Sequence, residues 1–311
     1  MNGILLLLFW LLVLLSGCSS RDAVDDSPVS EVRIALDWKG VTDKLPETMR
    51  VIFYPKDAEG RKVESYFSGE GGKVMVPVGS YSVIIYNYDT ESVQVRGDGR
   101  YETIEAYTGY CTGVNGTENM VWSPDAFYVV AQDDVVIEQS DVALQMKFKP
   151  EAVVRSYSFD IKIAGMKNVA GIVCYVNGLN GCYCLGKRTV AAGEAPICVD
   201  TAWKDGVLWG YFSGFVLLEN ATTRASSSIT LTMKLIKIDN TVQEVKVDVT
   251  EVIEVPPEED DETKPDEEIH IEVPIPDGEI KVDDVEPETG GGGIGGDVGD
   301  WDDETNIELP V

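Results

Sequence analysis

Six cysteines and a single histidine are the side chains of this 311-residue chain that best suit redox, nucleophilic or metal chemistry. Cys182 and Cys184 lie two residues apart, so in a β-strand both point to the same face of the sheet. If residues 177–181 form a hairpin loop, Cys174 lies opposite Cys184 at a separation that a disulfide tolerates. The competing interpretation treats these cysteines as small buried apolar residues, because an odd number of cysteines follows Cys18 and at least one thiol stays unpaired.

The single histidine, His270, decides the outlook for catalysis. It lies in an acidic C-terminal segment, so a Ser-His-Asp or Cys-His arrangement would have to recruit it from there. Carboxylates are too numerous for any pair to stand out as a glycosidase pair, and no phosphate-binding glycine loop precedes a predicted helix. The cysteine spacing matches no common zinc module. We therefore predict no catalytic site, no metal site and no cofactor.

Arg96-Gly97-Asp98 spells a tripeptide that some animal integrins recognise. The wider sequence, Arg96-Gly97-Asp98-Gly99-Arg100, is also a good turn sequence, because glycine and aspartate both favour tight turns. We predict a turn at this position rather than a recognition motif.

The N-terminus indicates the compartment. Residues Ile4 to Leu15 are all apolar and would span roughly 18 Å as a helix, too little for a ~30 Å hydrocarbon core. This length fits the apolar region of a secretory signal peptide. Leu15-Ser16-Gly17-Cys18 follows and resembles a bacterial lipobox, in which a signal peptidase cuts before a cysteine that carries lipid. We predict a signal peptide over residues 1–17 and a lipidated tether over residues 18–30.

A lipid on Cys18 would hold the mature chain at a membrane. Each buried methylene contributes ~0.8 kcal/mol, and stable anchoring needs more than one acyl chain, which bacterial lipoproteins carry. No other stretch of the sequence is long and apolar enough to span a bilayer. We therefore expect a globular body on a lipid tether.

The charge of the chain is strongly negative and unevenly spread. With 54 acidic and 25 basic residues the net charge is −29, which excludes an electrostatic nucleic-acid binder. Residues 256–311 hold 21 of the acidic and two of the basic residues, together with four consecutive glycines at 290–293. Such a composition is typical of a solvated segment. Alternating apolar residues nevertheless predict an edge strand over 269–275 and a terminal strand over 307–311.

The rest of the chain has the pattern of β-structure, because apolar and polar residues alternate with a period of two. The clearest hairpin joins residues 229–238 to residues 242–252 across Asp239-Asn240. Its predicted inward-facing residues are Ile229, Leu231, Met233, Leu235, Val245, Val247 and Val249.

This pattern predicts an all-β fold of two tandem antiparallel β-sandwich domains. The first domain is expected over residues 31–149 and the second over residues 150–255. An acidic, glycine-rich C-terminal segment follows over residues 256–311.

Several short motifs recur together in one known group of proteins. They are the lipobox, Asp37-Trp38, Phe53-Tyr54-Pro55, Val76-Pro77-Val78-Gly79-Ser80-Tyr81, Glu105-Ala106-Tyr107-Thr108 and Asp300-Trp301-Asp302-Asp303. With them the chain resembles an uncharacterised family of Bacteroidetes lipoproteins that is similar to the fimbrillin-like proteins of type V pili. The resemblance implies two transthyretin-like domains, a location at the outer membrane and the cell surface, and no enzyme activity.

We therefore predict a non-enzymatic, lipid-anchored cell-surface protein that is a fimbrillin-like pilus subunit or anchor, or an adhesin. Its expected partners are the outer membrane, through the lipid, and other pilus subunits. The alternative is a surface lipoprotein that binds a glycan or another ligand through exposed aromatic side chains. The candidate aromatic residues are Trp122, Trp203, Trp209 and Tyr211.

Overall fold

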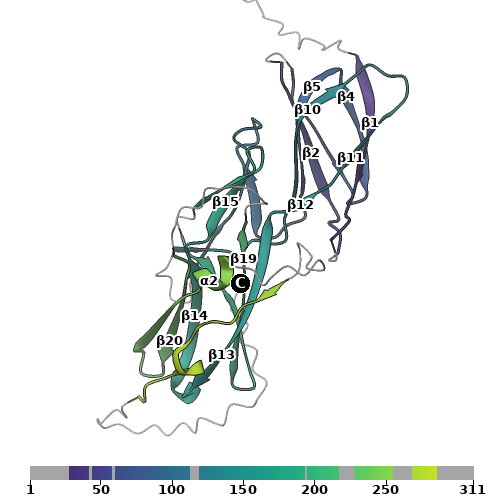
Figure 1. The fold of residues 1–311 in the computed structure, drawn as a ribbon. Helices are drawn as coiled ribbons and strands as arrows, with labels where there is room; N and C mark the ends of the chain where they lie inside the picture. The colour runs from purple at the N-terminus through teal and green to yellow at the C-terminus, as the bar shows by residue number, and fades with distance from the viewer. Residues whose placement is uncertain are drawn as a thin grey trace, which may run out of the picture.

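The computed structural model describes residues 28–41, 44–57, 60–112, 119–192, 195–216, 228–254 and 268–285. Within these ranges the chain folds into two β-sheet bodies that lie end to end, and we call them the upper body and the lower body (Figure 1). The predicted lipobox, Leu15, Ser16, Gly17 and Cys18, lies outside the described residues. So does the terminal strand predicted over residues 307–311.

The upper body consists of two facing sheets. The first has the order β11-β1-β4 and contains β1 (Val29–Leu36), β4 (Gly71–Pro77) and β11 (Leu144–Phe148). The second has the order β12-β10-β5-β2-β3 and contains β2 (Met49–Pro55), β3 (Val63–Phe67), β5 (Gly79–Asn87), β10 (Tyr128–Ile137) and β12 (Glu151–Ala152). Alternate residues of both sheets pack together between them, as the sequence period predicts.

The lower body also has two facing sheets. One runs β22-β13-β19-β15-β7-β6 along its described strands, with β16, β18 and β23 paired at its sides. Its strands are β6 (Val93–Arg96), β7 (Glu105–Thr108), β13 (Val154–Ala164), β15 (Asn180–Cys184), β16 (Thr189–Ala192), β18 (Asp200–Lys204), β19 (Val207–Phe215), β22 (Ile269–His270) and β23 (Glu279–Lys281).

The facing sheet of the lower body has the order β21-β20-β14-β17-β9-β8. Its strands are β8 (Tyr110–Thr112), β9 (Asn119–Val121), β14 (Val169–Asn177), β17 (Ile197–Cys198), β20 (Thr230–Lys237) and β21 (Val242–Asp248). The helical elements are short: α2 (Thr250–Glu254) and the 3₁₀ turns η1 (Met166–Asn168) and η2 (Pro276–Gly278). None of the helices in the described ranges has the length and apolar character that crossing a membrane requires.

The prediction that residues 31–149 form one unit and residues 150–255 another is wrong at β6 to β9. These strands pair with the lower body, where Ala106 of β7 lies opposite Tyr183 and Val121 of β9 lies beside Ile197. The chain therefore leaves the upper body after β5, adds four strands to the lower body and returns with β10. Alternation identifies strands but not their partners, so a domain boundary placed by sequence order cannot show that β6 to β9 pair with the lower body.

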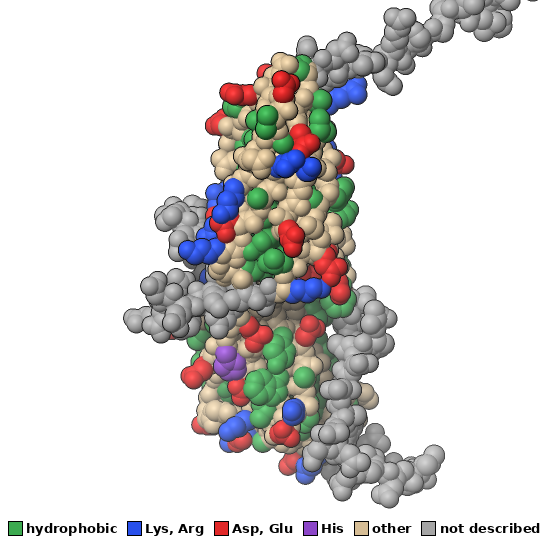
Figure 2. Space-filling model, turned by 90° about the vertical axis from the view of Figure 1, so that its right-hand side faces the viewer, with side chains coloured by type: hydrophobic (Ala, Val, Ile, Leu, Met, Phe, Trp, Pro, Cys, Tyr) green, Lys and Arg blue, Asp and Glu red, His purple; other side chains and the backbone are tan. Residues whose placement is uncertain are grey.

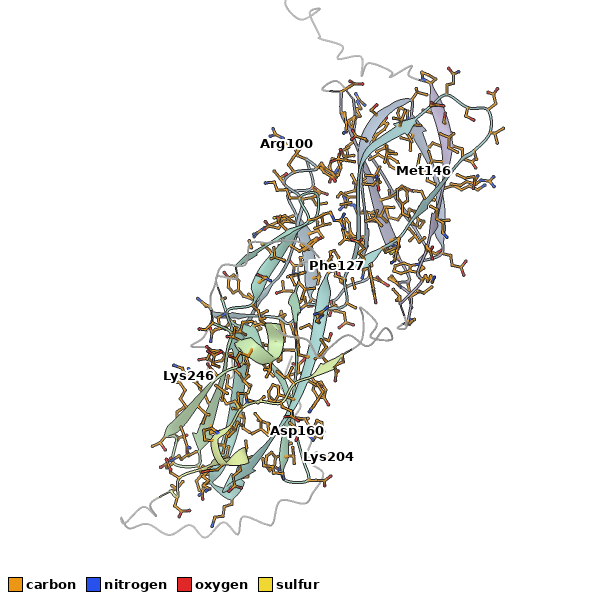
Figure 3. The ribbon with its side chains drawn as sticks, in the orientation of Figure 1. Arg100, Phe127, Met146, Asp160, Lys204 and Lys246 are labelled. Atoms are coloured by element: carbon orange, nitrogen blue, oxygen red, sulfur yellow. The ribbon has the colours of Figure 1, made fainter. Side chains whose placement is uncertain are left out.

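A third apolar core joins the two bodies. Ile84 and Tyr86 of β5 belong to the same buried cluster as Ala106 of β7 and Tyr183 of β15. Phe127, 1% exposed, lies in this cluster where the two bodies meet (Figure 3). Because the junction is a packed core rather than a linker, the two bodies hold each other in one arrangement.

Part of the predicted acidic extension belongs to the fold. Residues 268–285 run beside β13, with β22 and β23 each pairing parallel to it. Ile271, Ile280 and Val282 are buried against the core of the lower body. The alternation that predicted an edge strand at 269–275 is confirmed at Ile269–His270, and the segment covers an edge of the sheet that would otherwise expose backbone groups.

The predicted hairpin in the second half is confirmed as far as Asp248, whereas residues 250–252, predicted as strand, belong to α2. Strands β20 and β21 pair with Leu231 opposite Val247 and Met233 opposite Val245. Leu231, Met233 and Leu235 are fully buried in the core of the lower body, and Val245 packs against its margin. The face chosen from the alternation is therefore the inward face.

Candidate functional site

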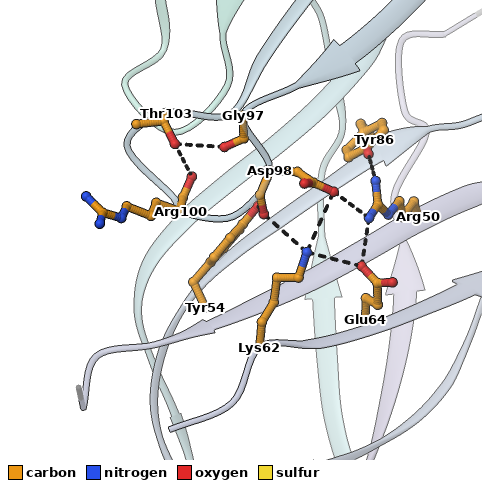
Figure 4. Close-up of polar contacts among 9 residues, drawn as sticks. All are labelled: Arg50, Tyr54, Lys62, Glu64, Tyr86, Gly97, Asp98, Arg100 and Thr103. Atoms are coloured by element: carbon orange, nitrogen blue, oxygen red, sulfur yellow. Dashed lines mark hydrogen bonds and ion pairs between the residues drawn. The ribbon is translucent and has the colours of Figure 1, made fainter. Parts of the chain in front are cut away.

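A polar cluster fastens the two bodies together beside their shared core. Arg50 of β2 donates hydrogen bonds to Tyr86 Oη, Glu64 Oε2 and Asp98 Oδ2, each 2.7 Å long (Figure 4). Asp98 lies in the turn between β6 and β7, so this contact links the lower body to the upper one. Lys62 Nζ lies 3.6 Å from Asp98 Oδ2 and donates to the Asp98 carbonyl oxygen at 3.2 Å. We call Arg50, Lys62, Glu64 and Asp98 the clasp.

The clasp explains the Arg96-Gly97-Asp98 tripeptide. Gly97 has φ +67°, and a Cβ there would lie 2.2 Å from the Thr103 carbonyl oxygen, so the turn requires glycine. The Asp98 carboxylate is held by Arg50 and Lys62 of the same molecule. The predicted turn is confirmed, and its aspartate docks the β6–β7 hairpin.

Electrostatics within the clasp favour the ionised carboxylates. The hydrogen bond from Arg50 lowers the pKa of Asp98, and it lowers the pKa of Glu64 in the same way. A carboxyl whose pKa is lower in the folded state stabilises the fold above its unfolded pKa of about 4, and this contribution is lost as the pH falls through the folded pKa. The clasp should therefore weaken in acid.

Replacing Arg50 with methionine should lower the free energy of unfolding by about 2–4 kcal/mol at pH 7, because Glu64 and Asp98 would lose their two 2.7 Å hydrogen bonds and keep only Lys62, at 3.4 and 3.6 Å, as a cation. Both carboxylates remain partly open to water, which keeps the loss below that of a fully buried pair. Urea unfolding at pH 7 and at pH 3 measures it, and the difference from wild type should shrink at pH 3. Arg33→Met, which removes an exposed pair with Glu31, is the control and should cost under about 1 kcal/mol. Equal stability of Arg50→Met and wild type at pH 7 would show that the clasp does not hold the bodies together.

His270 is brought from the C-terminal segment onto β13. Its Nδ1 lies 3.3 Å from Ser158 Oγ and its Nε2 lies 3.1 Å from Asp160 Oδ1. The three residue types are those of a Ser-His-Asp triad, but Ser158 is only 3% exposed, so its hydroxyl is not open to a substrate in this structure. The contacts instead tie residues 268–271 to the sheet, together with a 2.8 Å hydrogen bond from the Ile271 N–H to the Ser158 carbonyl oxygen.

The outer face of the same sheet carries a line of apolar side chains beside His270. On β19 the inward residues Leu208 and Phe212 are buried, so Val207, Trp209 and Tyr211 point outward. We call Trp209 and Tyr211 the aromatic row, and Val207 continues the same line. The Trp209 and His270 rings lie 6.4 Å apart, and Figure 2 shows hydrophobic side chains gathered beside the histidine on this face.

The predicted aromatic candidates therefore separate into groups. Trp209 and Tyr211 lie together in the aromatic row. Trp203 of β18 is partly buried against the core of the lower body, so it packs inside. Trp122 follows β9 in the facing sheet and is 47% exposed. The sequence period could pair 209 with 211 but could not show that 203 faces the other way.

Three comparisons with known proteins fit this architecture. Residues 17–200 match the model of a protein family described as "Domain of unknown function (DUF5119)". A protein of Bacteroides ovatus named "Putative fimbrium anchoring subunit Fim4B" is 47% identical over an alignment of 330 positions, which covers 99% of this chain and 98% of the relative.

The chain belongs to the DUF5119 family.

Two solved structures share the fold. The crystal structure of a "putative adhesin" from Bacteroides ovatus is 44% identical to this DUF5119 protein and superposes with a TM-score of 0.72, covering 88% of this chain and 99% of that chain. A second "putative adhesin" from the same species, 11% identical, shares the fold with a TM-score of 0.53 over 79% of this chain and 88% of that chain. The resemblance to fimbrillin-like Bacteroidetes proteins that the motifs indicated is confirmed.

The cysteines of this DUF5119 protein do not form the predicted hairpin pair. Cys174 lies on β14 and Cys184 on β15, and these strands belong to different sheets, so the prediction that the two cysteines face each other across a hairpin is wrong. The segment 177–181 connects the two layers instead of turning within one. All five cysteines in the described part of the chain are free.

The surroundings of the thiols are those of apolar core residues. Burial raises the pKa of Cys182 to about 11 and that of Cys198 to about 12. Because the thiolate is the nucleophile and the metal ligand, thiols with such pKa values are unreactive near neutral pH. The environment of these two residues favours the interpretation as small buried side chains.

Proposed function

We propose that this protein is the lipid-anchored subunit that attaches a fimbrium to the outer surface of a bacterial cell. The observation that carries the proposal is the 47% identity to a named fimbrium anchoring subunit, because it extends over nearly the whole of both chains. Identity at this level along the whole length supports the same role and not only the same fold.

The lipobox supplies the means of attachment. Cys18 would bear the lipid after cleavage behind Leu15-Ser16-Gly17, and the predicted tether over residues 18–30 would lead from it into β1, which begins at Val29. The location we propose is therefore the outer membrane, with the two bodies facing outward. Each body would correspond to one transthyretin-like β-sandwich domain.

The protein acts without catalysis in this proposal. Its relatives are fimbrial and adhesive proteins, the Ser158 hydroxyl beside His270 is buried, and the thiols of Cys182 and Cys198 have raised pKa values. In this proposal the protein binds other fimbrial subunits and remains attached to the outer membrane. A role as an adhesin is the second candidate, and the observation that favours it is the 44% identity to the "putative adhesin" structure.

Crosslinking in living cells tests the proposed partnership. A C-terminally tagged chain is captured from solubilised outer membranes after treatment with a cleavable amine crosslinker, and the bound proteins are identified by mass spectrometry. We expect fimbrial subunits to be enriched over a capture with an unrelated tagged outer-membrane lipoprotein. Equal recovery of fimbrial subunits in both captures would contradict the proposal.

A further inference from the structure

The outer face around β19 has a regular arrangement of side chains, set by the register of three strands. Residues that pair directly across antiparallel strands point to the same face. Trp209 is therefore flanked by Asp160 of β13 and by Ala202 of β18. One step along, Tyr211 is flanked by Ser158 and Asp200, and in the other direction Val207 is flanked by Lys162 and Lys204. Asp160 and Lys204 are labelled in Figure 3 on the lower body.

The strand that carries the aromatic row, β19, is packed closely against the core of the lower body. Gly210, between Trp209 and Tyr211, lies opposite the fully buried Phe159, and a Cβ at position 210 would lie 2.1 Å from the Phe159 ring. The ring of Phe159 thus covers the glycine from inside and fixes the strand. Phe212 stacks with Tyr157 below the same strand, at a centroid distance of 5.2 Å. The backbone that carries the two outward rings is therefore held by the core beneath it.

The rings are open to solvent on the side of β18. Tyr211 is 41% exposed, Trp209 is partly exposed and Ala202 beside Trp209 is too small to cover the indole. On the opposite side Asp160 and His270 border the indole, joined by their 3.1 Å contact. The result is an exposed strip of the sheet one strand wide, with apolar side chains along its middle and polar side chains along both margins.

The margins carry groups that are free to bind. Lys162, Lys204 and Asp200 form no ion pair with any of the described residues. Partial burial raises the pKa of Asp200, as expected for a carboxyl group that loses water without gaining a cation. Ammonium groups donate and carboxylates accept hydrogen bonds, so the margins offer both kinds of partner.

A sugar chain suits this exposed strip better than a protein does. A pyranose ring has an apolar C–H face, which stacks on an aromatic ring, and hydroxyl groups around its edge, which both donate and accept hydrogen bonds. Positions 209 and 211 are about 6.7 Å apart along a strand, so two neighbouring sugars of one chain can cover both rings. Protein interfaces need about 800 Å² on each partner and avoid charges at their centre, whereas charged side chains here lie directly beside the rings.

We propose that the aromatic row binds a glycan, with sugar rings stacked on Trp209 and Tyr211 and hydroxyl groups bonded to Asp160, His270, Asp200 and the two lysines. The site lies on the lower body, whereas β1, the first described strand, lies in the upper body. It gives the protein a ligand of its own and does not require the proposed fimbrial role.

A glycan array carrying neutral and acidic oligosaccharides, followed by calorimetric titration of the strongest binder, tests the proposal on the purified chain from residue 19 onward. We expect saturable binding by the wild type and at least tenfold weaker binding by Trp209→Ala. Ala202→Arg should cause a similar loss, because it keeps both rings and covers the open side of the indole. Trp122→Ala, a tryptophan exposed elsewhere, should bind within twofold of wild type, and thermal melting confirms that each variant is folded.

Three results would overturn the proposal. One is the absence of binding to any glycan on the array by the folded wild-type protein. Another is binding that Trp209→Ala and Ala202→Arg leave unchanged, which would place the glycan elsewhere. If Trp209→Ala instead loses only the fimbrial subunits captured by crosslinking, the face is a protein interface and the glycan assignment is wrong.

Discussion

Replacing Cys18 with alanine should move the protein out of the membrane fraction or leave it as an uncleaved precursor. Cys18 is the predicted acceptor of the acyl chains, and each methylene that they bury contributes ~0.8 kcal/mol to membrane binding. The sequence has no second apolar stretch that could take over. Fractionation of cells after a high-salt wash, with the size of the protein read by immunoblot, measures the effect, which should be close to complete.

Cys182→Ala is the matched control for this experiment. It also removes one thiol, but Cys182 lies on β15 in the lower body, far along the chain from the signal peptide. This variant should be processed and should sediment with membranes as the wild type does. A Cys18→Ala protein that is still cleaved and still sediments after the wash would refute the lipid anchor.

Replacing Leu231 with alanine should lower the free energy of unfolding by ~2–5 kcal/mol. Leu231 is fully buried between the sheets of the lower body, opposite Val247, so the truncated side chain leaves a cavity as well as losing buried apolar area. A loss of this size is a large fraction of the stability of a typical domain. Chemical unfolding followed by circular dichroism measures it.

Val242→Ala on the neighbouring strand provides the comparison for Leu231→Ala. Val242 is 55% exposed, so its truncation should change the stability by less than about 0.5 kcal/mol. If both variants unfold at the same denaturant concentration as the wild type, the core of the lower body does not depend on the inward face of β20.

Sequence alternation predicted the β class and the inward face of the hairpin at Leu231 because both depend on neighbouring residues along the chain. It could not predict that β7 joins β15, since that pairing links Ala106 to Tyr183 across a long stretch of chain. The same limit explains the error at Cys174 and Cys184. A short segment with turn residues can close a hairpin or cross between sheets, and the local sequence does not distinguish the two.

The candidate binding surface was predictable only in part. Trp209 and Tyr211 were identified as candidates from their residue types, and their spacing of two places them on one face. Asp160 and Asp200 could not be connected with them, because no local sequence pattern predicts the register in which β13 and β18 pair with β19. His270 belonged by composition to a solvated acidic segment, yet parallel pairing with β13 places it beside Trp209.

The most direct test of the central claim is to count the fimbriae that remain on cells lacking this chain. Electron microscopy of washed cells, with immunoblotting of the main fimbrial subunit in the cell-free medium, compares the deletion strain with the same strain carrying the restored gene. The proposal predicts that cells without the chain lose their attached fimbriae while the subunit collects in the medium, and that the restored gene reverses both changes. Attached fimbriae of unchanged number on cells without the chain would contradict it.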